Sequence, residues 1–190
     1  SGVNLSAQSQ LRGFEPNESR ITCLAKTTTQ TPAHYDNEWT LNGIQQDYSF
    51  CNWTNPNFQV AVIDKSNLQA WATRYTYPNG TVANPGNGFG NLNDNSSACF
   101  ARPMKYFTFG QSTLDQINKF QNFVENVVPD GDYILVYTPI ATRYDWWNQL
   151  DTTLYATFQN MGSTQIVPGR PNKPMIFLTR KGDPSFVVEI

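Results

Sequence analysis

One stretch near the middle of the chain constrains the fold more than any other. Thr113-Leu-Asp-Gln116 matches the capping-box pattern found at helix starts. Apolar residues then recur at helical spacing until Pro129-Asp-Gly131 ends the pattern. The continuous apolar run from Tyr133 to Tyr137 follows, as expected for a strand covered on both faces. We therefore predict a helix over 114–127 and a buried strand directly after it.

The segments before this stretch have strand character. Phe58 to Asp64 and Leu68 to Tyr77 predict a β-hairpin with its turn at 64–67. Lys105 to Phe109 predicts a short aromatic strand. The order strand, helix, strand then suggests a right-handed crossover.

The C-terminal part predicts a second helix and three more strands. The helix is expected over Asn148 to Met161, with Gly162 as a left-handed terminator. The strands are expected at 165–167, 175–179 and 186–190. In the N-terminal third, only 20–25 and 38–42 read as strands.

These elements predict a mixed α/β (α+β) fold in which a β-sandwich-like mixed sheet is covered by two helices. We expect residues 1–56 to form a β-rich segment packed on the same domain, and residues 57–190 to form the main α/β domain. A chain of 190 residues is long enough to bury a sizeable core.

Charge and composition exclude several functions. The net charge is −2 and the 13 Lys and Arg residues are scattered, so we expect no nucleic-acid partner. No apolar run is long enough to predict a membrane span. No P-loop, dinucleotide or zinc motif occurs, so we expect no cofactor and no metal. The turn acids Asp130 and Asp132 can suit a hard cation, although solvation is the simpler interpretation.

The three cysteines cannot all pair within the chain. Cys51 and Cys99 lie on either side of a loop-rich stretch and can close it as a disulfide, which would stabilise the fold by about 3–4 kcal/mol. Cys23 would then be a small buried apolar residue. The alternative, three reduced thiols, stays open.

The cluster Arg143-Tyr144-Asp145-Trp146-Trp147 is the strongest candidate for a ligand site. It follows the predicted central strand, and the ends of such strands commonly carry ligands. Aromatic faces can stack on a sugar ring while Asp and Arg bind its hydroxyls. In the alternative interpretation one Trp packs into the core and the other caps the helix start.

The order of motifs from Phe58 onward resembles the interleukin-like EMT inducer family, also called PANDER-like. The resemblance rests on Asp130-Gly-Asp-Tyr-Ile-Leu-Val136, on Phe158-Gln-Asn-Met-Gly-Ser163 and on Lys181-Gly182, in this order after a strand that ends in Val-Ile-Asp64. It is similar in particular to versions in secreted Bacteroidetes proteins, including sortase-like proteins of type IX secretion.

The resemblance implies a mixed α/β fold without a catalytic centre. In one member, the stem of a glycosyltransferase, a carboxylate after the central strand and an Arg before the last apolar strand hold N-acetylglucosamine. Asp145 matches the first position. Arg170 lies near the second, displaced within Gly169-Arg-Pro-Asn-Lys-Pro174.

We therefore expect a non-catalytic accessory domain of an exported, extracellular or cell-surface bacterial protein. Its partner would be a glycan of the N-acetylglucosamine type or a protein, and other domains of a larger chain would flank it. The alternatives are a structural or protein-interaction module of a type IX secretion protein and, as a third, an enzyme.

Overall fold

The computed structural model describes residues 4–12, 18–26, 37–49, 56–72, 75–76, 82–83, 89–90 and 105–190. Within these ranges the strands are β1 (Asn4–Arg12), β2 (Glu18–Lys26), β3 (Asn37–Leu41), β4 (Ile44–Ser49), β5 (Asn57–Ile63), β6 (Tyr75–Thr76), β7 (Val82–Ala83), β8 (Phe107–Gly110), β9 (Tyr133–Tyr137), β10 (Ile176–Arg180) and β11 (Asp183–Glu189). The helices are α1 (Leu114–Asn122), its π-helical continuation η2 (Phe123–Val127), α2 (Tyr144–Leu150) and α3 (Thr153–Asn160).

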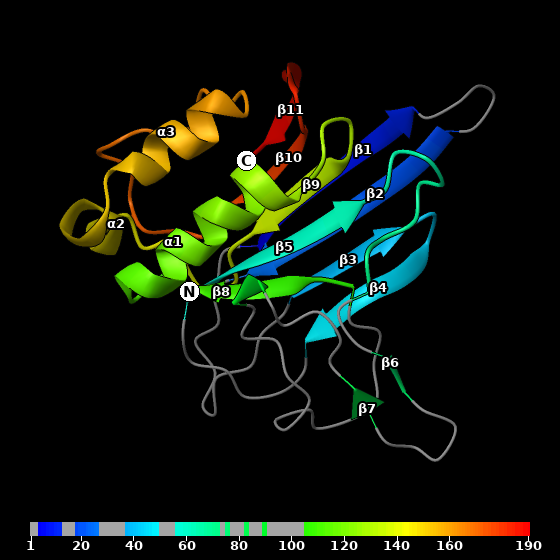
Figure 1. Cartoon of the computed structure of the whole chain (residues 1–190), viewed down its shortest axis with the longest axis horizontal. Helices are drawn as coiled ribbons and strands as arrows, with labels where there is room; N and C mark the ends of the chain where they lie inside the picture. The colour runs from blue at the N-terminus through cyan, green and yellow to red at the C-terminus, as the bar shows by residue number, and fades with distance from the viewer. Residues whose placement is uncertain are drawn as a thin grey trace.

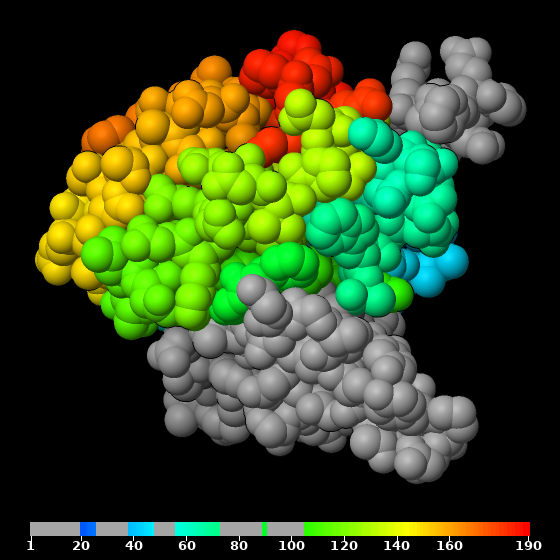
Figure 2. All heavy atoms as spheres, in the orientation of Figure 1, coloured from blue at the N-terminus to red at the C-terminus, as the bar shows by residue number. Residues whose placement is uncertain are grey.

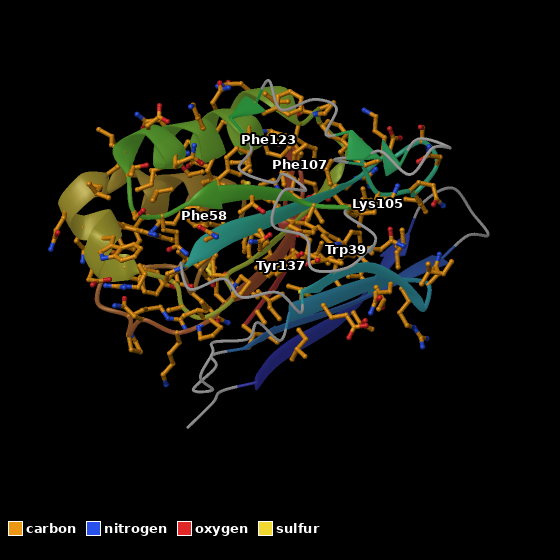
Figure 3. The ribbon with its side chains drawn as sticks, turned by 90° about the horizontal axis from the view of Figure 1, so that it is seen from below. Trp39, Phe58, Lys105, Phe107, Phe123 and Tyr137 are labelled. Carbon is orange, nitrogen blue, oxygen red and sulfur yellow. The ribbon has the colours of Figure 1, made fainter. Side chains whose placement is uncertain are left out.

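Two antiparallel sheets and one layer of helices make up the fold (Figure 1). The strand orders are β1-β2-β3-β4 and β11-β10-β9-β5-β8, and β6 pairs with β7 separately. The helices cover the face of the five-stranded sheet that is turned away from the four-stranded sheet (Figure 3). The expected α+β, sandwich-like architecture is thus confirmed.

Alternation along the central strands creates two cores. On β5, Phe58, Val60 and Val62 belong to the core under the helices, which includes Phe107 and Phe123. Ala61 and Ile63, which alternate with them, belong to the core between the two sheets, where Trp39 and Tyr137 also lie (Figure 3). Because both faces are buried, these strands read as continuous apolar runs rather than as alternating ones.

The crossover differs from a simple strand–helix–strand unit. β8 and β9 each pair antiparallel with β5, so they run in the same direction with β5 between them. The five-stranded sheet therefore contains only antiparallel pairings and is not a mixed sheet. The sequence places β8 and β9 in the right order around α1, but it carries no signal that a third strand separates them.

The helix predicted over 114–127 is present as α1 and η2. Thr113 caps it, accepting a hydrogen bond of 3.3 Å from the backbone N–H of Gln116. The Gln116 side chain does not return this bond as in a capping box. Its Oε1 accepts from the backbone N–H of Gly110 instead, which ties the helix to the end of β8. The last turn widens to the π form, with Val128 donating to the carbonyl of Phe123.

The helix predicted over 148–161 is two helices, so three helices cover the sheet instead of two. Asp151 separates α2 from α3, because its Oδ1 accepts from both the backbone N–H and the hydroxyl of Thr153. Gly162 ends α3 as expected, with φ +106°. A Cβ there would lie 2.2 Å from the carbonyl oxygen of Pro184, so only glycine fits.

Of the second strand of the predicted hairpin, 68–77, the described residues 68–72 do not form a continuous strand, and residues 75–76 form β6, which pairs with β7 instead. A single bridge joins Ala70 to Ile63, after which Trp71 packs edge-on against Phe107 and Phe123. Leu68, at φ +53°, turns the chain out of the strand conformation. The predicted strand at 165–167 does not form either, because the carboxylate of Glu189 binds the loop backbone at 164 and 165.

The N-terminal strands pack on the main sheet, and Asn42 and Gly43, at φ +53° and +78°, form the turn between β3 and β4. Cys23 lies between the sheets and is buried. Cys51 and Cys99 lie outside the described residues, so their disulfide stays a prediction, as does the boundary at residue 56. Of the helices that the structure describes, none is long and apolar enough to cross a membrane.

Candidate ligand-binding site

Two segments lie together at one rim of the molecule, near α2 (Figure 1). One follows β9 in the chain, and the other leads into β10. We call residues 143–146 together with 170–173 the rim. The backbone N–H of Thr138, just past β9, donates to the carbonyl of Met175, and the Met175 N–H returns a bond of 2.8 Å to the Thr138 hydroxyl. Thr142 donates its N–H to the carbonyl of Lys173 at 2.8 Å. These bonds hold the two segments together.

Gln111 fixes the start of α2 from below. Its side chain is fully buried, and its Oε1 accepts from the backbone N–H of Arg143 at 2.9 Å and from the indole N–H of Trp147 at 3.1 Å. Its Nε2 donates to the carbonyl of Ala141. A buried amide with several partners holds a loop in one conformation, so the rim is preorganised.

Arg143, Asp145 and Asn172 form the polar surface of the rim. The guanidinium of Arg143 binds both carboxylate oxygens of Asp145, at 2.9 and 2.7 Å. Asn172 donates a further hydrogen bond of 2.8 Å to Oδ1 of Asp145. The Arg143 guanidinium also lies 3.8 Å from the ring centroid of the half-buried Trp146.

The electrostatics of the rim follow from these contacts. The hydrogen bonds from Arg143, together with the one from Asn172, lower the pKa of Asp145 to about 2. The same pairing raises the pKa of Arg143. Both groups are therefore charged at neutral pH, and both remain accessible, with side-chain exposures of 28% and 46% for Arg143 and Asp145.

Tyr144 and Trp147, also predicted as ligand contacts, point into the core instead. Trp147 is fully buried and stacks parallel on Phe158 at 5.6 Å. Tyr144 is 4% exposed, and burial raises its pKa to about 12. The alternative interpretation, in which one Trp of the pair packs into the core, is correct for Trp147.

Arg170 lies on the second segment but does not pair with Asp145. Its Nη1 donates to the carbonyl of Gln165 at 2.7 Å, within the same loop. The partner of Asp145 from this segment is Asn172. Sequence reasoning missed Asn172 and Gln111. Asn172 lies two residues after Arg170, so the prediction of Arg170 as a ligand contact pointed weakly to it. No local sequence pattern marks Gln111.

Within the described ranges, no three His, Cys, Asp or Glu side chains gather as a group that could hold a metal ion. The rim offers hydrogen-bond donors, one ionised acceptor and the exposed part of the Trp146 indole that the Arg143 guanidinium does not cover. Comparison with protein-family models, with curated proteins and with solved structures found no match for the chain. Its resemblance to the interleukin-like EMT inducer family therefore stays a prediction.

Proposed function

We propose that this chain is a non-catalytic binding domain of an exported bacterial protein, and that its rim holds a sugar residue of the N-acetylglucosamine type. The observation that carries the proposal is the Arg143–Asp145–Asn172 group beside the half-buried Trp146. A pyranose ring offers hydroxyl groups that donate and accept, together with an apolar face that can stack on an aromatic ring.

The hydrogen-bonding capacity of the group supports a hydroxyl ligand. Oδ1 of Asp145 accepts from Arg143 and Asn172, whereas Oδ2 accepts from Arg143, and the backbone N–H of Trp146 adds a weaker stabilisation of the carboxylate. Oδ2 therefore retains acceptor capacity for a ligand hydroxyl or amide. Arg143 uses Nε and one N–H of Nη2 on Asp145, and its Nη1 has no partner among the described residues, so that edge can donate.

The rim needs little reorganisation to bind. Gln111 and the threonine bonds hold its backbone, and the ion pair holds its side chains, so the entropic cost of ordering them has been met on folding. A shallow site of this kind would bind with a dissociation constant of about micromolar to millimolar, or about 4–8 kcal/mol.

A glycan array followed by calorimetry with N-acetylglucosamine oligomers tests the proposal. Asp145→Asn should weaken binding by about tenfold or more, since one hydrogen bond to a charged group contributes roughly 1.5–3 kcal/mol. Asp115→Asn is the matched control, because Asp115 forms a comparable ion pair of 2.9 Å with Lys119 on α1. It should leave sugar binding unchanged.

An array on which no glycan binds the folded domain would overturn the proposal. Binding that Asp145→Asn and Asp115→Asn reduce equally would also overturn it. Capture of a flanking domain of the same parent protein by the rim, without any glycan, would instead support the protein-interaction alternative.

A further inference from the structure

A second polar depression lies at the opposite end of β9 from the rim. We call this cleft, of about 260 Å³, the turn cleft; it lies between the end of η2, the end of α3 and the β10–β11 turn. These segments meet at the upper edge of the molecule in Figure 2. Its polar lining consists of Glu125, Asp130, Asn160, Arg180 and Lys181. Pockets that hold drug-sized ligands have volumes of about 300–1,000 Å³, so the turn cleft suits a smaller molecule.

The backbone around the turn cleft is fixed. The N–H of Gly131 donates to the carbonyl of Lys181 at 2.7 Å, and the N–H of Lys181 donates to the carbonyl of Asp132 at 2.8 Å. Gly182, at φ +81°, lies against the Asp130 side chain, which a Cβ would approach to 3.2 Å. The Asp130 carboxylate is therefore packed directly against the β10–β11 turn.

Arg180 is held so that one edge of its guanidinium stays available. Its Nε donates to the carbonyl of Gly131 at 3.0 Å, and its guanidinium lies 5.1 Å from the ring centroid of Tyr133. Within the part of the chain that the structure describes, its two terminal nitrogens have no hydrogen-bond or ion-pair partner. A guanidinium fixed in this way presents two parallel N–H groups, the geometry that binds a carboxylate in a bidentate manner.

Lys181 is used differently, as a structural cation. Its ammonium donates to the carbonyls of Val124 and Glu125, where η2 ends. Burial lowers its pKa, and the opposing effects of Asp130 and Glu125 show that both carboxylates lie within electrostatic range of it.

The two carboxylates retain unused acceptor capacity. Lys65 binds the backbone carbonyl of Asp130 and not its carboxylate, which has no hydrogen bond or ion pair to any described residue. Glu125 accepts from the Thr157 hydroxyl through Oε1, and its Oε2 has no hydrogen-bond partner among the described residues. The turn cleft thus pairs an available guanidinium edge with available carboxylates, while its lining charges sum to zero.

We propose that the turn cleft binds a small zwitterion of the amino-acid type, with Arg180 holding its carboxylate and Asp130 and Glu125 holding its ammonium. A neutral lining favours a ligand without net charge, and the unused groups, one guanidinium edge and two carboxylates, favour a ligand that carries charges of both signs. Aromatic stacking, which commonly orients sugars, is not offered by the residues lining the turn cleft. This inference is independent of the proposed sugar site at the rim.

The test is an amide NMR titration of the folded chain with each standard amino acid in turn. The best binder is then compared with its N-acetyl derivative, which lacks the ammonium, and its amide, which lacks the carboxylate. We expect shifts at Gly131, Lys181 and Gly182 with the zwitterion, and binding at least about tenfold weaker for each derivative, as loss of one charge-assisted pair predicts.

Two variants test the assigned roles. Asp130→Asn and Arg180→Lys should each lower the affinity for the zwitterion by about tenfold. Asp115→Asn on α1 should leave this affinity unchanged. The derivative comparison uses the unaltered chain, so the proposal stays testable even if a variant fails to fold. The proposal is overturned if no amino acid shifts these amides, if both derivatives bind as well as the parent, or if N-acetylglucosamine shifts the same amides instead.

Discussion

The phenol of Tyr137 donates a hydrogen bond of 2.5 Å to Oδ2 of Asp47, and both residues are fully buried between the two sheets. Tyr137 ends the central strand β9, and Asp47 lies on β4. The contact therefore joins the four-stranded sheet to the five-stranded sheet through a polar pair inside an apolar core.

Removing this phenol should destabilise the whole fold. We expect Tyr137→Phe to lower the free energy of unfolding by about 1–3 kcal/mol, because it leaves a buried carboxylate oxygen without this donor. Urea unfolding measures the change. Tyr155→Phe is the control, since its partner Asn148 is exposed and can bind water, so the loss there should be smaller. Equal losses in the two variants would contradict the role given to the Tyr137–Asp47 pair.

Replacing Gln111 should destabilise the fold, because its one side chain satisfies several buried groups. Gln111→Leu removes the acceptor of Arg143 N–H and of the Trp147 indole, each of which costs about 1–3 kcal/mol if left unsatisfied when buried. We expect a clear loss of thermal stability and a change in tryptophan fluorescence. An unchanged melting temperature would show that the rim is not held from below by this amide.

The ionisation of Asp145 gives a pH prediction. Its pKa is about 2 in the folded chain, below the value of about 3.9 expected when unfolded. The stabilisation from its hydrogen bonds is therefore complete above about pH 4 and is lost as the pH falls towards 2. A carboxyl-carbon NMR titration should find this midpoint, and Arg143→Met should move it up towards about 3.9. A midpoint near 4 in the unaltered chain would contradict the ion-pair geometry.

Cys23 should be chemically inert in the folded protein. It is 3% exposed, and burial, with a further contribution from Asp47, raises the pKa of its thiol. Iodoacetamide labelling followed by peptide mapping should leave Cys23 unmodified until the chain is unfolded. Rapid labelling of Cys23 under native conditions would show that the two sheets separate readily.

The fold was predictable wherever local pattern and tertiary packing agree. The helix after Thr113 and the strand at 133–137 were predictable because capping, periodicity and burial all indicate the same structure. The break at Asp151 was missed, since a side chain binding its own local backbone interrupts an otherwise unbroken helical period. The prediction of a second hairpin strand beginning at Leu68 was wrong there, because Leu68 adopts a positive φ that its residue type does not suggest.

The candidate site was predictable only in part. A polar and aromatic cluster directly after a central strand is visible in the sequence, and it drew attention to Arg143 and Asp145. Which member of a Trp pair faces the core depends on the angle at which α2 meets the sheet, and the sequence does not encode that angle locally. Asn172 and Gln111 reach the site across the fold, 27 and 32 residues away from Asp145 and Arg143 respectively, so only the tertiary structure reveals them.

The most direct test of the proposed function follows two indole N–H resonances while N-acetylglucosamine oligomers are added up to about millimolar concentration. Trp146 lies on the rim under Arg143, whereas the neighbouring Trp147 is buried and bonded to Gln111, so it serves as an internal control. We predict that the Trp146 resonance shifts and saturates while the Trp147 resonance changes little. A Trp146 signal that stays in place throughout the titration would contradict sugar binding at the rim.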